Sequence, residues 1–211
     1  MLNKIIKNIL ASLVISLITL ALFLLAIIFL TKARLLNNFP SALSMIRQIY
    51  TDSRDIVQFN NNCSQYDARL YYKLKPGECD FKNIEFSTKL FINKHGLRDD
   101  EESLIKPEII VLGDSHAMGF GVEQQQTFAN LLEKNLATKV LNAGISSYGS
   151  AREFLMLQDL DKKALKYLVI QYCNNDYSEN KEFVDNNFSL KISSKASYEA
   201  LSRENLSLIH I

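Results

Sequence analysis

Ser115 stands where a serine can act as a nucleophile. It follows a run of apolar residues at 109–112, which predicts a buried strand, and Gly113 ends that run. A serine just beyond such a strand, where the chain turns into a helix, lies near N–H groups that the first helical turn leaves unpaired. Those donors stabilise an oxyanion that forms during acyl transfer. The alternative is that Asp114 and Ser115 only cap the helix.

Two more polar segments follow apolar runs later in the chain. Residues 142–149 begin with Asn142, and residues 173–176 read Cys-Asn-Asn-Asp, a composition that is also typical of an ordinary polar turn. Strands are predicted at 108–112, 139–141 and 167–172, and helices at 123–136 and 150–160. Strands that alternate with helices predict a parallel sheet, whose carboxyl ends would bring the three polar segments together.

The three segments, in this order, resemble the conserved blocks of the SGNH (GDSL) hydrolases over roughly residues 107–180. The resemblance implies that Ser115 attacks an ester or acyl carbonyl, while the Ser115 N–H, a backbone N–H of the second segment and the Asn175 side chain donate to the oxyanion. Ser147 takes the place of the family's glycine in the second segment, and Gly144 or Gly149 is the alternative donor. The implied fold is a flavodoxin-like three-layer α/β/α domain of about five parallel strands, of which three are evident. The implied mechanism needs no cofactor, and the sequence contains no evident metal constellation.

The family's Asp-x-x-His segment, which supplies the catalytic base, is absent from the sequence. The histidines are His95, His116 and His210, and none has an aspartate three residues before it. We therefore assign none of them as the base and expect the polypeptide as given to be inactive or nearly so. His116, directly after Ser115, resembles the Gly-Asp-Ser-His variant of some polysaccharide-modifying members.

Arg98 ends a segment, residues 93–98, that resembles the Asn-x-x-Gly-x-Arg segment found before the first block in envelope members of the family. It could bind a carboxylate or a sugar acid, or it could fix a loop through carbonyl groups. Together these features predict a serine esterase or acyl-transfer enzyme that acts on an O-acyl ester, with an envelope polysaccharide as the expected carrier of the acyl group. The alternative is a non-catalytic binding or assembly module on the same fold.

The N-terminal region predicts a membrane anchor. Residues 8–31 carry no charge and are mostly apolar, and at about 1.5 Å per residue they cross a hydrocarbon core of about 30 Å. The apolar run is too long for a cleaved signal peptide, and no small-residue cleavage site follows it. Basic residues lie on both sides of the span, so the positive-inside rule only slightly favours residues 1–7 in the cytoplasm and the remainder outside it.

Cys63 and Cys79 are expected to form a disulfide at the base of a hairpin, which would agree with an oxidising compartment. The alternative is two unpaired thiols, and Cys173 would be a small buried residue. Residues 32–57 predict a membrane-proximal spacer with a short amphipathic helix, residues 58–106 a β-rich lead-in, and residues 107–205 an incomplete hydrolase domain. Residues 206–211 resemble the translated end of a sequencing adapter, so we expect a non-native tail and a reading frame cut near Asn205. With 24 basic and 23 acidic residues, the composition gives no indication of nucleic-acid binding.

Overall fold

The structure, a computed structural model, describes residues 2–32, 55–83, 85–174 and 176–209. The chain forms two compact units, residues 1–53 and residues 54–211. The amphipathic helix expected around residues 43–50 lies outside the described residues. The β-rich lead-in and the predicted hydrolase region both belong to the second unit.

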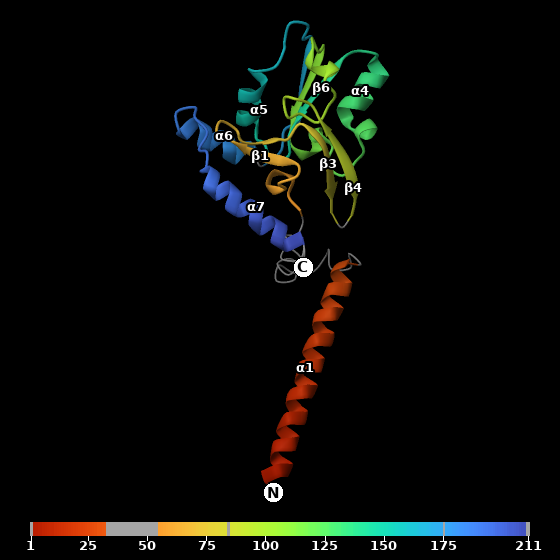
Figure 1. Cartoon of the computed structure of the whole chain (residues 1–211), viewed down its shortest axis with the longest axis vertical. Helices are drawn as coiled ribbons and strands as arrows, with labels where there is room; N and C mark the ends of the chain where they lie inside the picture. The colour runs from red at the N-terminus through yellow and green to blue at the C-terminus, as the bar shows by residue number, and fades with distance from the viewer. Residues whose placement is uncertain (1, 33–54, 84, 175, 210–211) are drawn as a thin grey trace. The chain divides into compact units, whose positions relative to one another are not determined.

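The first unit contains one long helix, α1 (Leu2–Lys32; Figure 1). Its residues Leu10–Phe29 have a mean hydropathy of 2.9 and are almost all exposed. Apolar side chains on every face of a helix suit a lipid environment better than water. The helix is long and apolar enough to cross a membrane, as an anchor or a signal sequence does.

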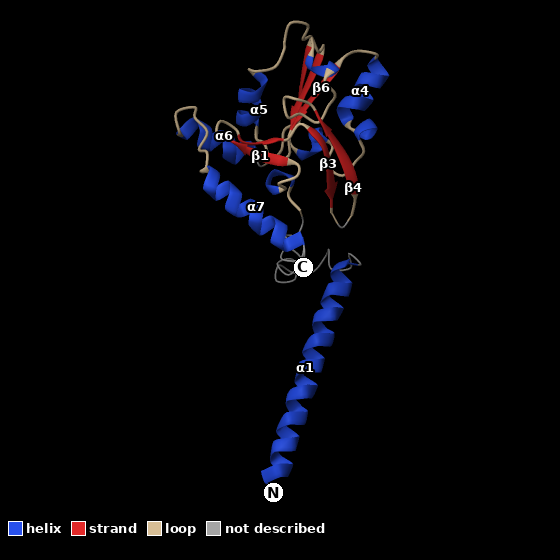
Figure 2. Cartoon of the chain, viewed as in Figure 1, coloured by secondary structure: helices blue, strands red, loops and turns tan. Residues whose placement is uncertain are grey.

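The second unit is a mixed α/β structure with a three-stranded parallel sheet in the order β6-β5-β7 (Figure 2). Its strands are β5 (Ile109–Gly113), β6 (Val140–Gly144) and β7 (Tyr167–Ile170). β5 lies in the middle, with Ile109 opposite Val140 on one side and Tyr167 on the other. Helices α4 (Phe128–Leu136) and α5 (Ser150–Leu157) lie in the two connections. The predicted alternation of strands and helices and the parallel pairing are confirmed.

The helix predicted over 123–136 begins later than expected. Residues Gln124–Gln126 form a separate 3-10 turn, η3, and the backbone of Thr127 is extended, with ψ near 148°. The Thr127 hydroxyl accepts a hydrogen bond from the Asn130 N–H, so this residue caps α4. The apolar spacing predicted the helix, and the capping threonine inside the segment sets its actual start.

Residues 57–92 form two antiparallel hairpins after a short 3-10 turn, η1 (Val57–Phe59). The first pairs β1 (Ser64–Asp67) with β2 (Tyr71–Leu74), and the second pairs β3 (Gly77–Lys82) with β4 (Ser87–Ile92). A disulfide joins Cys63, directly before β1, to Cys79 in β3. It therefore ties the first hairpin to the second, whereas the sequence suggested a staple within one hairpin.

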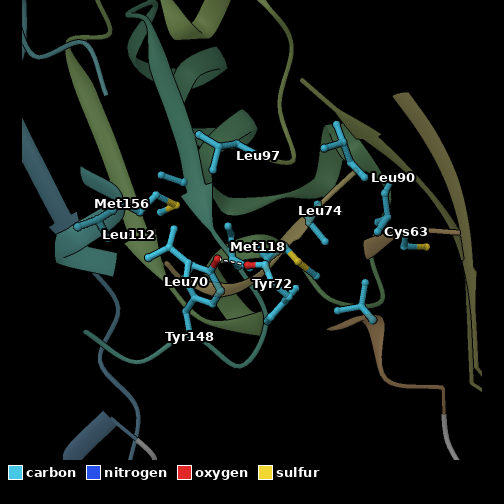
Figure 3. Close-up of a cluster of buried hydrophobic side chains, with 14 of the residues drawn as sticks. Cys63, Leu70, Tyr72, Leu74, Leu90, Leu97, Leu112, Met118, Tyr148 and Met156 are labelled. Carbon is cyan, nitrogen blue, oxygen red and sulfur yellow. Dashed lines mark hydrogen bonds between the residues drawn. The ribbon is translucent and has the colours of Figure 1, made fainter. Parts of the chain in front are cut away.

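One apolar core joins the hairpins to the sheet (Figure 3). Tyr72 of β2 and Leu90 of β4 are buried in the same cluster as Leu112 of β5 and Leu141 of β6. Since both hairpins contribute buried apolar side chains to this cluster, they stabilise the sheet and are stabilised by it. The lead-in is thus an integral part of the folded unit.

The last two helices are α6 (Asp176–Asp185) and α7 (Lys195–Ile209). Tyr198 of α7 is buried among the rings of Phe59, Tyr66 and Tyr71, and its hydroxyl donates to the Gln58 carbonyl at 2.6 Å. α7 is therefore packed against the first hairpin. Strand β7 differs from the other two strands because Tyr167, Leu168 and Ile170 are all exposed.

Candidate active site

Ser115 is the first residue of a short helix, α3 (Ser115–Met118), that follows strand β5 directly. Asp114 is the N-cap, and its carboxylate accepts a hydrogen bond from the His116 N–H at 3.0 Å. The capping role of Asp114 is therefore confirmed, and it places the half-buried Ser115 at the first turn of α3. The strand-turn-helix geometry expected for a nucleophile is present.

Gly144, at the end of β6, lets α3 approach the sheet. A Cβ atom at this position would lie 2.4 Å from the Met118 nitrogen, a distance that forces the backbone to move. The Ile145 N–H also donates to the Gly113 carbonyl at 3.0 Å, which fixes the end of β6 beside the end of β5. This glycine is needed for close packing, so any larger residue would displace the turn that carries Ser115.

The ends of β5 and β7 are joined by Gln171. Its backbone N–H donates to the Leu112 carbonyl at 3.0 Å, and its side-chain Oε1 accepts from the N–H groups of Asp114 and Ala117 at 3.2 and 3.3 Å. The three polar segments predicted from the sequence thus leave the sheet on the same side, at the carboxyl ends of its three parallel strands.

The structure distinguishes the three candidate backbone donors of the second segment. The Gly144 N–H donates to Asn142 Oδ1 at 3.1 Å, and the Gly149 N–H donates to Glu179 Oε1 at 3.2 Å. Among the described residues, the Ser147 N–H donates to no acceptor. Ser147 also has φ of +61°, a left-handed conformation that glycine adopts easily. It therefore retains the backbone conformation that a glycine would give.

The first hairpin holds the segment around Ser147. The Tyr72 hydroxyl donates to the Ser146 carbonyl. The Tyr148 hydroxyl donates back to the Tyr72 carbonyl, and Figure 3 shows these two tyrosines side by side. The two buried rings meet edge to face with centroids 5.4 Å apart. Paired hydroxyls and rings of this kind fix a loop in one conformation.

Arg98 is completely buried, and its guanidinium binds the loop after α3. It donates to the carbonyls of Met118, Gly119 and Val122, and to the side chain of Gln124 at 3.1 Å. Burial lowers the pKa of Arg98 to about 10. Of the two alternatives, the structure supports the loop-fixing role, and Arg98 has no exposed surface with which to meet a sugar acid.

The neighbouring Asp99 is hydrogen-bonded to the backbone of β6, an outer strand of the three-stranded sheet. Its Oδ2 accepts from the Asn142 N–H of β6 at 2.7 Å, and its Oδ1 accepts from the Asp100 N–H at 2.9 Å. Burial raises the pKa of Asp99 to about 6, although these hydrogen bonds oppose the shift. Residues 98 and 99 thus support the first and second polar segments respectively.

The third polar segment leads into α6, one face of which caps α5. Asp176 is buried and accepts from the backbone N–H groups of Ser150, at 2.9 Å, and Cys173. Glu179 accepts from the Gly149 N–H and Asn180 Oδ1 accepts from the Ala151 N–H. Asn175, the predicted oxyanion side chain, lies outside the described residues. The buried role of Asp176 shows that this segment is more than a solvated turn.

None of the described histidines is hydrogen-bonded to the Ser115 hydroxyl. The His116 side chain is 76% exposed, and its Nδ1 lies 3.2 Å from Asp114 Oδ1 and 4.0 Å from Cys173 Sγ. His95 lines a separate cavity of about 670 Å³ with Asp159, Asp161 and neighbouring lysines. His210 lies outside the described residues.

The structure brings out two features that the sequence did not predict. Glu153 of α5 is buried with both carboxylate oxygens unpaired among the described residues. Burial, and then the charges of Asp176, Asp114 and Glu179, raise the pKa of Glu153 to about 8. Its spacing from Met156 and Leu160, three and seven residues on, was the available signal for a carboxylate on the buried helix face.

The second feature is the approach of Cys173 to Asp114 and His116. Oxygen, nitrogen and sulfur atoms of these three side chains all lie within 4.8 Å of one another. Because 57 residues separate His116 from Cys173, spacing along the chain gave no metal-binding signature.

A second cavity, of about 480 Å³, is lined by Ser147, by Arg152 of α5 and by Glu179 and other residues of α6. Arg152 pairs with Glu179 at 2.6 Å on its wall. Ser147 therefore faces a space large enough for a small ligand, whereas Ser115 lines neither of the two cavities.

Comparison of the chain with protein-family models and with curated proteins finds no match. The arguments for a function therefore come from the arrangement of the residues themselves.

Proposed function

We propose that this chain is a membrane-anchored serine esterase or acyl-transfer enzyme of the SGNH type, with a flavodoxin-like α/β/α architecture. The observation that carries the proposal is the convergence of three polar segments at the carboxyl edge of the β6-β5-β7 sheet. Ser115 starts a helix there, and Ser147, whose N–H has no acceptor among the described residues, has a glycine-like backbone conformation. In open parallel sheets this edge is where ligands bind.

In the proposed reaction the Ser115 Oγ attacks an acyl carbonyl while its proton passes to a base. The backbone N–H groups of Ser115 and Ser147 and the Asn175 amide receive the oxyanion, and the alcohol leaves with the proton. Water or an acceptor hydroxyl then attacks the acyl-enzyme, which gives hydrolysis or transfer. Among the described residues no histidine is hydrogen-bonded to the Ser115 hydroxyl, so we expect an external base to accelerate the reaction.

The proposed substrate is an O-acyl ester carried by an envelope glycan. The support for a glycan substrate comes from the proposed anchor, residues 8–31, and from His116. Arg98 no longer supports it, because its side chain is buried against loop carbonyls. The proposed location is a single-pass arrangement with residues 54–211 outside the cytoplasm. The disulfide between Cys63 and Cys79 supports this side of the membrane, since such bonds persist in oxidising compartments.

A non-catalytic glycan-binding module is the second candidate. The observation that favours it is that the His116 ring contacts Asp114 and Cys173 and makes no hydrogen bond with the Ser115 hydroxyl. A module of this kind would use the same edge of the sheet for binding without breaking the ester.

Chemical rescue tests the proposal with the chain as it exists. The detergent-solubilised protein is mixed with an aryl acetate, and imidazole is added as an external base. We expect aryl release above the imidazole-only rate, with one acetyl group on the peptide that contains Ser115. Ser115→Ala should abolish this excess, and Ser87→Ala, at an exposed position in β4, should preserve it.

Equal rates for the unmodified protein and Ser115→Ala would show that Ser115 is not a nucleophile. Binding of an O-acetylated glycan with no acetate release, under the same conditions, would establish the second candidate.

A further inference from the structure

Three side chains with metal-ligating atoms meet where β5 and β7 end. Asp114 and His116 come from the start of α3, and Cys173 follows β7 by three residues. His116 Nδ1 lies 3.2 Å from Asp114 Oδ1 and 4.0 Å from Cys173 Sγ, and all three ligand atoms lie within 4.8 Å of one another.

These separations are close to those of a tetrahedral zinc site. Zn²⁺ binds nitrogen and oxygen at about 2.0–2.2 Å and sulfur at about 2.3 Å, which places neighbouring ligand atoms roughly 3.3–3.8 Å apart. Side-chain shifts of up to about 1 Å, chiefly in the exposed His116, would complete the geometry. A thiolate and an imidazole select borderline transition metals over Mg²⁺ and Ca²⁺, which prefer oxygen ligands.

Gln171 contacts the side chain of one ligand residue, Cys173, and the backbone of another, Asp114. Its Nε2 donates to Cys173 Sγ at 3.4 Å, while its Oε1 accepts from the Asp114 N–H at 3.2 Å. Hydrogen bonds of this kind orient ligands before the metal arrives. The site is also accessible, because His116 is 76% exposed while Asp114, at 8%, forms its buried floor.

We propose that Asp114, His116 and Cys173 bind one Zn²⁺ ion and leave a fourth position for water. On binding, the Cys173 thiol releases its proton to solvent, and His116 coordinates through Nδ1 as a neutral imidazole. The two ligands from α3 flank Ser115 in the sequence, so the ion would lie next to the proposed nucleophile. The site does not depend on the proposed function, because Ser115 is not one of its ligands.

Metal titration of the detergent-solubilised chain tests this site. No reductant is added, so that Cys63 and Cys79 stay bonded, and a thiol assay first confirms that Cys173 is reduced. Calorimetry with Zn²⁺ should give one equivalent bound, and Co²⁺ substitution should give a thiolate-to-metal absorption band that Zn²⁺ displaces. Excess Mg²⁺ should leave both signals unchanged.

Substitutions at the three ligands and at Gln171 identify the side chains that bind the ion. Cys173→Ser and His116→Ala should each weaken Zn²⁺ binding by more than about 100-fold, and Gln171→Ala by about 10–100-fold. His95→Ala, at a different cavity, and Ser115→Ala should bind as the unmodified protein does. Circular dichroism establishes that each variant is folded.

Equal Zn²⁺ affinity for the unmodified protein and a folded Cys173→Ser, or a Co²⁺ complex without the thiolate band, would overturn the proposal. Retained binding by Ser115→Ala together with failed imidazole rescue would support the metal site while rejecting the esterase.

Discussion

Ser147 has a backbone conformation that its side chain disfavours. Its φ of +61° lies in the left-handed region, which costs an L-residue roughly 1–2 kcal/mol, whereas glycine adopts it freely. Part of that gain is lost because glycine also has more freedom when the chain is unfolded.

Ser147→Gly should therefore raise the free energy of unfolding by about 0.5–1 kcal/mol, measured by urea denaturation. The backbone N–H remains, so imidazole-rescued ester turnover should also remain. Ala137→Gly, at φ of +48° after α4, is the matched comparison and should stabilise by a similar amount. A destabilised Ser147→Gly beside a stabilised Ala137→Gly would show that the Ser147 hydroxyl makes an important contact.

Glu153 makes stability depend on pH. Its folded-state pKa of about 8 lies above the ordinary value of 4.5, so its contribution is fully present below pH 4.5 and is lost as the pH rises toward 8. Folding then binds a proton that the unfolded chain has already released.

Glu153→Gln should flatten the decline in melting temperature between about pH 4.5 and 8 and should raise the melting temperature at pH 8. Thermal unfolding at several pH values is the measurement. Glu182→Gln, an exposed substitution in α6, is the control and should leave the slope unchanged. Identical slopes for Glu153→Gln and the unmodified chain would mean that Glu153 is ionised or paired in the folded state.

At the scale of elements, α6 provides the N-terminal cap that α5 lacks in its own sequence. Gly149, the N-cap of α5, has no side chain, and the carboxylates of Asp176 and Glu179 accept from the N–H groups that would otherwise be unpaired. Negative charge at a helix N-terminus is also favourable because of the helix dipole. The third polar segment is thus coupled to the second through this contact.

Asp176→Asn should lower the free energy of unfolding by about 1.5–3 kcal/mol, the value of hydrogen bonds to a buried charged group. Denaturant unfolding measures the loss. Asp185→Asn, at the exposed end of α6, removes only an ion pair with Lys181 and should change stability by less than about 0.5 kcal/mol. Equal effects of the two substitutions would contradict the capping role.

The elements could be predicted from the sequence where local pattern decides the structure. The apolar run before Gly113 predicted β5 because buried parallel strands are continuously apolar. The second strand was predicted at 139–141, and the structure extends it through Asn142 to Gly144. The predicted start of α4 at residue 123 was wrong because Thr127, which lies inside the apolar pattern, caps the helix four residues later. The role of Arg98 could not be decided, since its carbonyl partners lie 20 or more residues away along the chain.

The same limit applied to the site. The position of Ser115 at a strand end followed from local pattern, whereas the partner of each backbone N–H depended on tertiary contacts. Glu179 removes Gly149 from the set of available donors, and 30 residues separate the two. No spacing rule in the sequence could predict that pairing.

In the second unit, the disulfide joins two hairpins, each of which contacts a different loop of the candidate site. The first hairpin holds the segment around Ser147 through Tyr72, and the second hairpin contacts the loop after α3 where Phe86 meets Gly121. Cys63 and Cys79 bond these two hairpins to each other.

The double substitution Cys63→Ser and Cys79→Ser should lower the free energy of unfolding by about 3 kcal/mol, as expected for a loop of about 15 residues. It should also increase hydrogen exchange in residues 119–122 and 146–149. Cys173→Ser, which removes a cysteine outside the disulfide, is the control. Unchanged exchange in both loops would show that the core alone holds them.

Strand β7 has a consequence for how this protein behaves at high concentration. Tyr167, Leu168 and Ile170 are exposed on both faces of a strand that forms one edge of the sheet. An apolar strand with an open edge can pair with an identical strand of another molecule, and this pairing starts aggregation. We therefore expect copies of residues 54–211 to associate through β7 at high concentration, however stable the core beside it is.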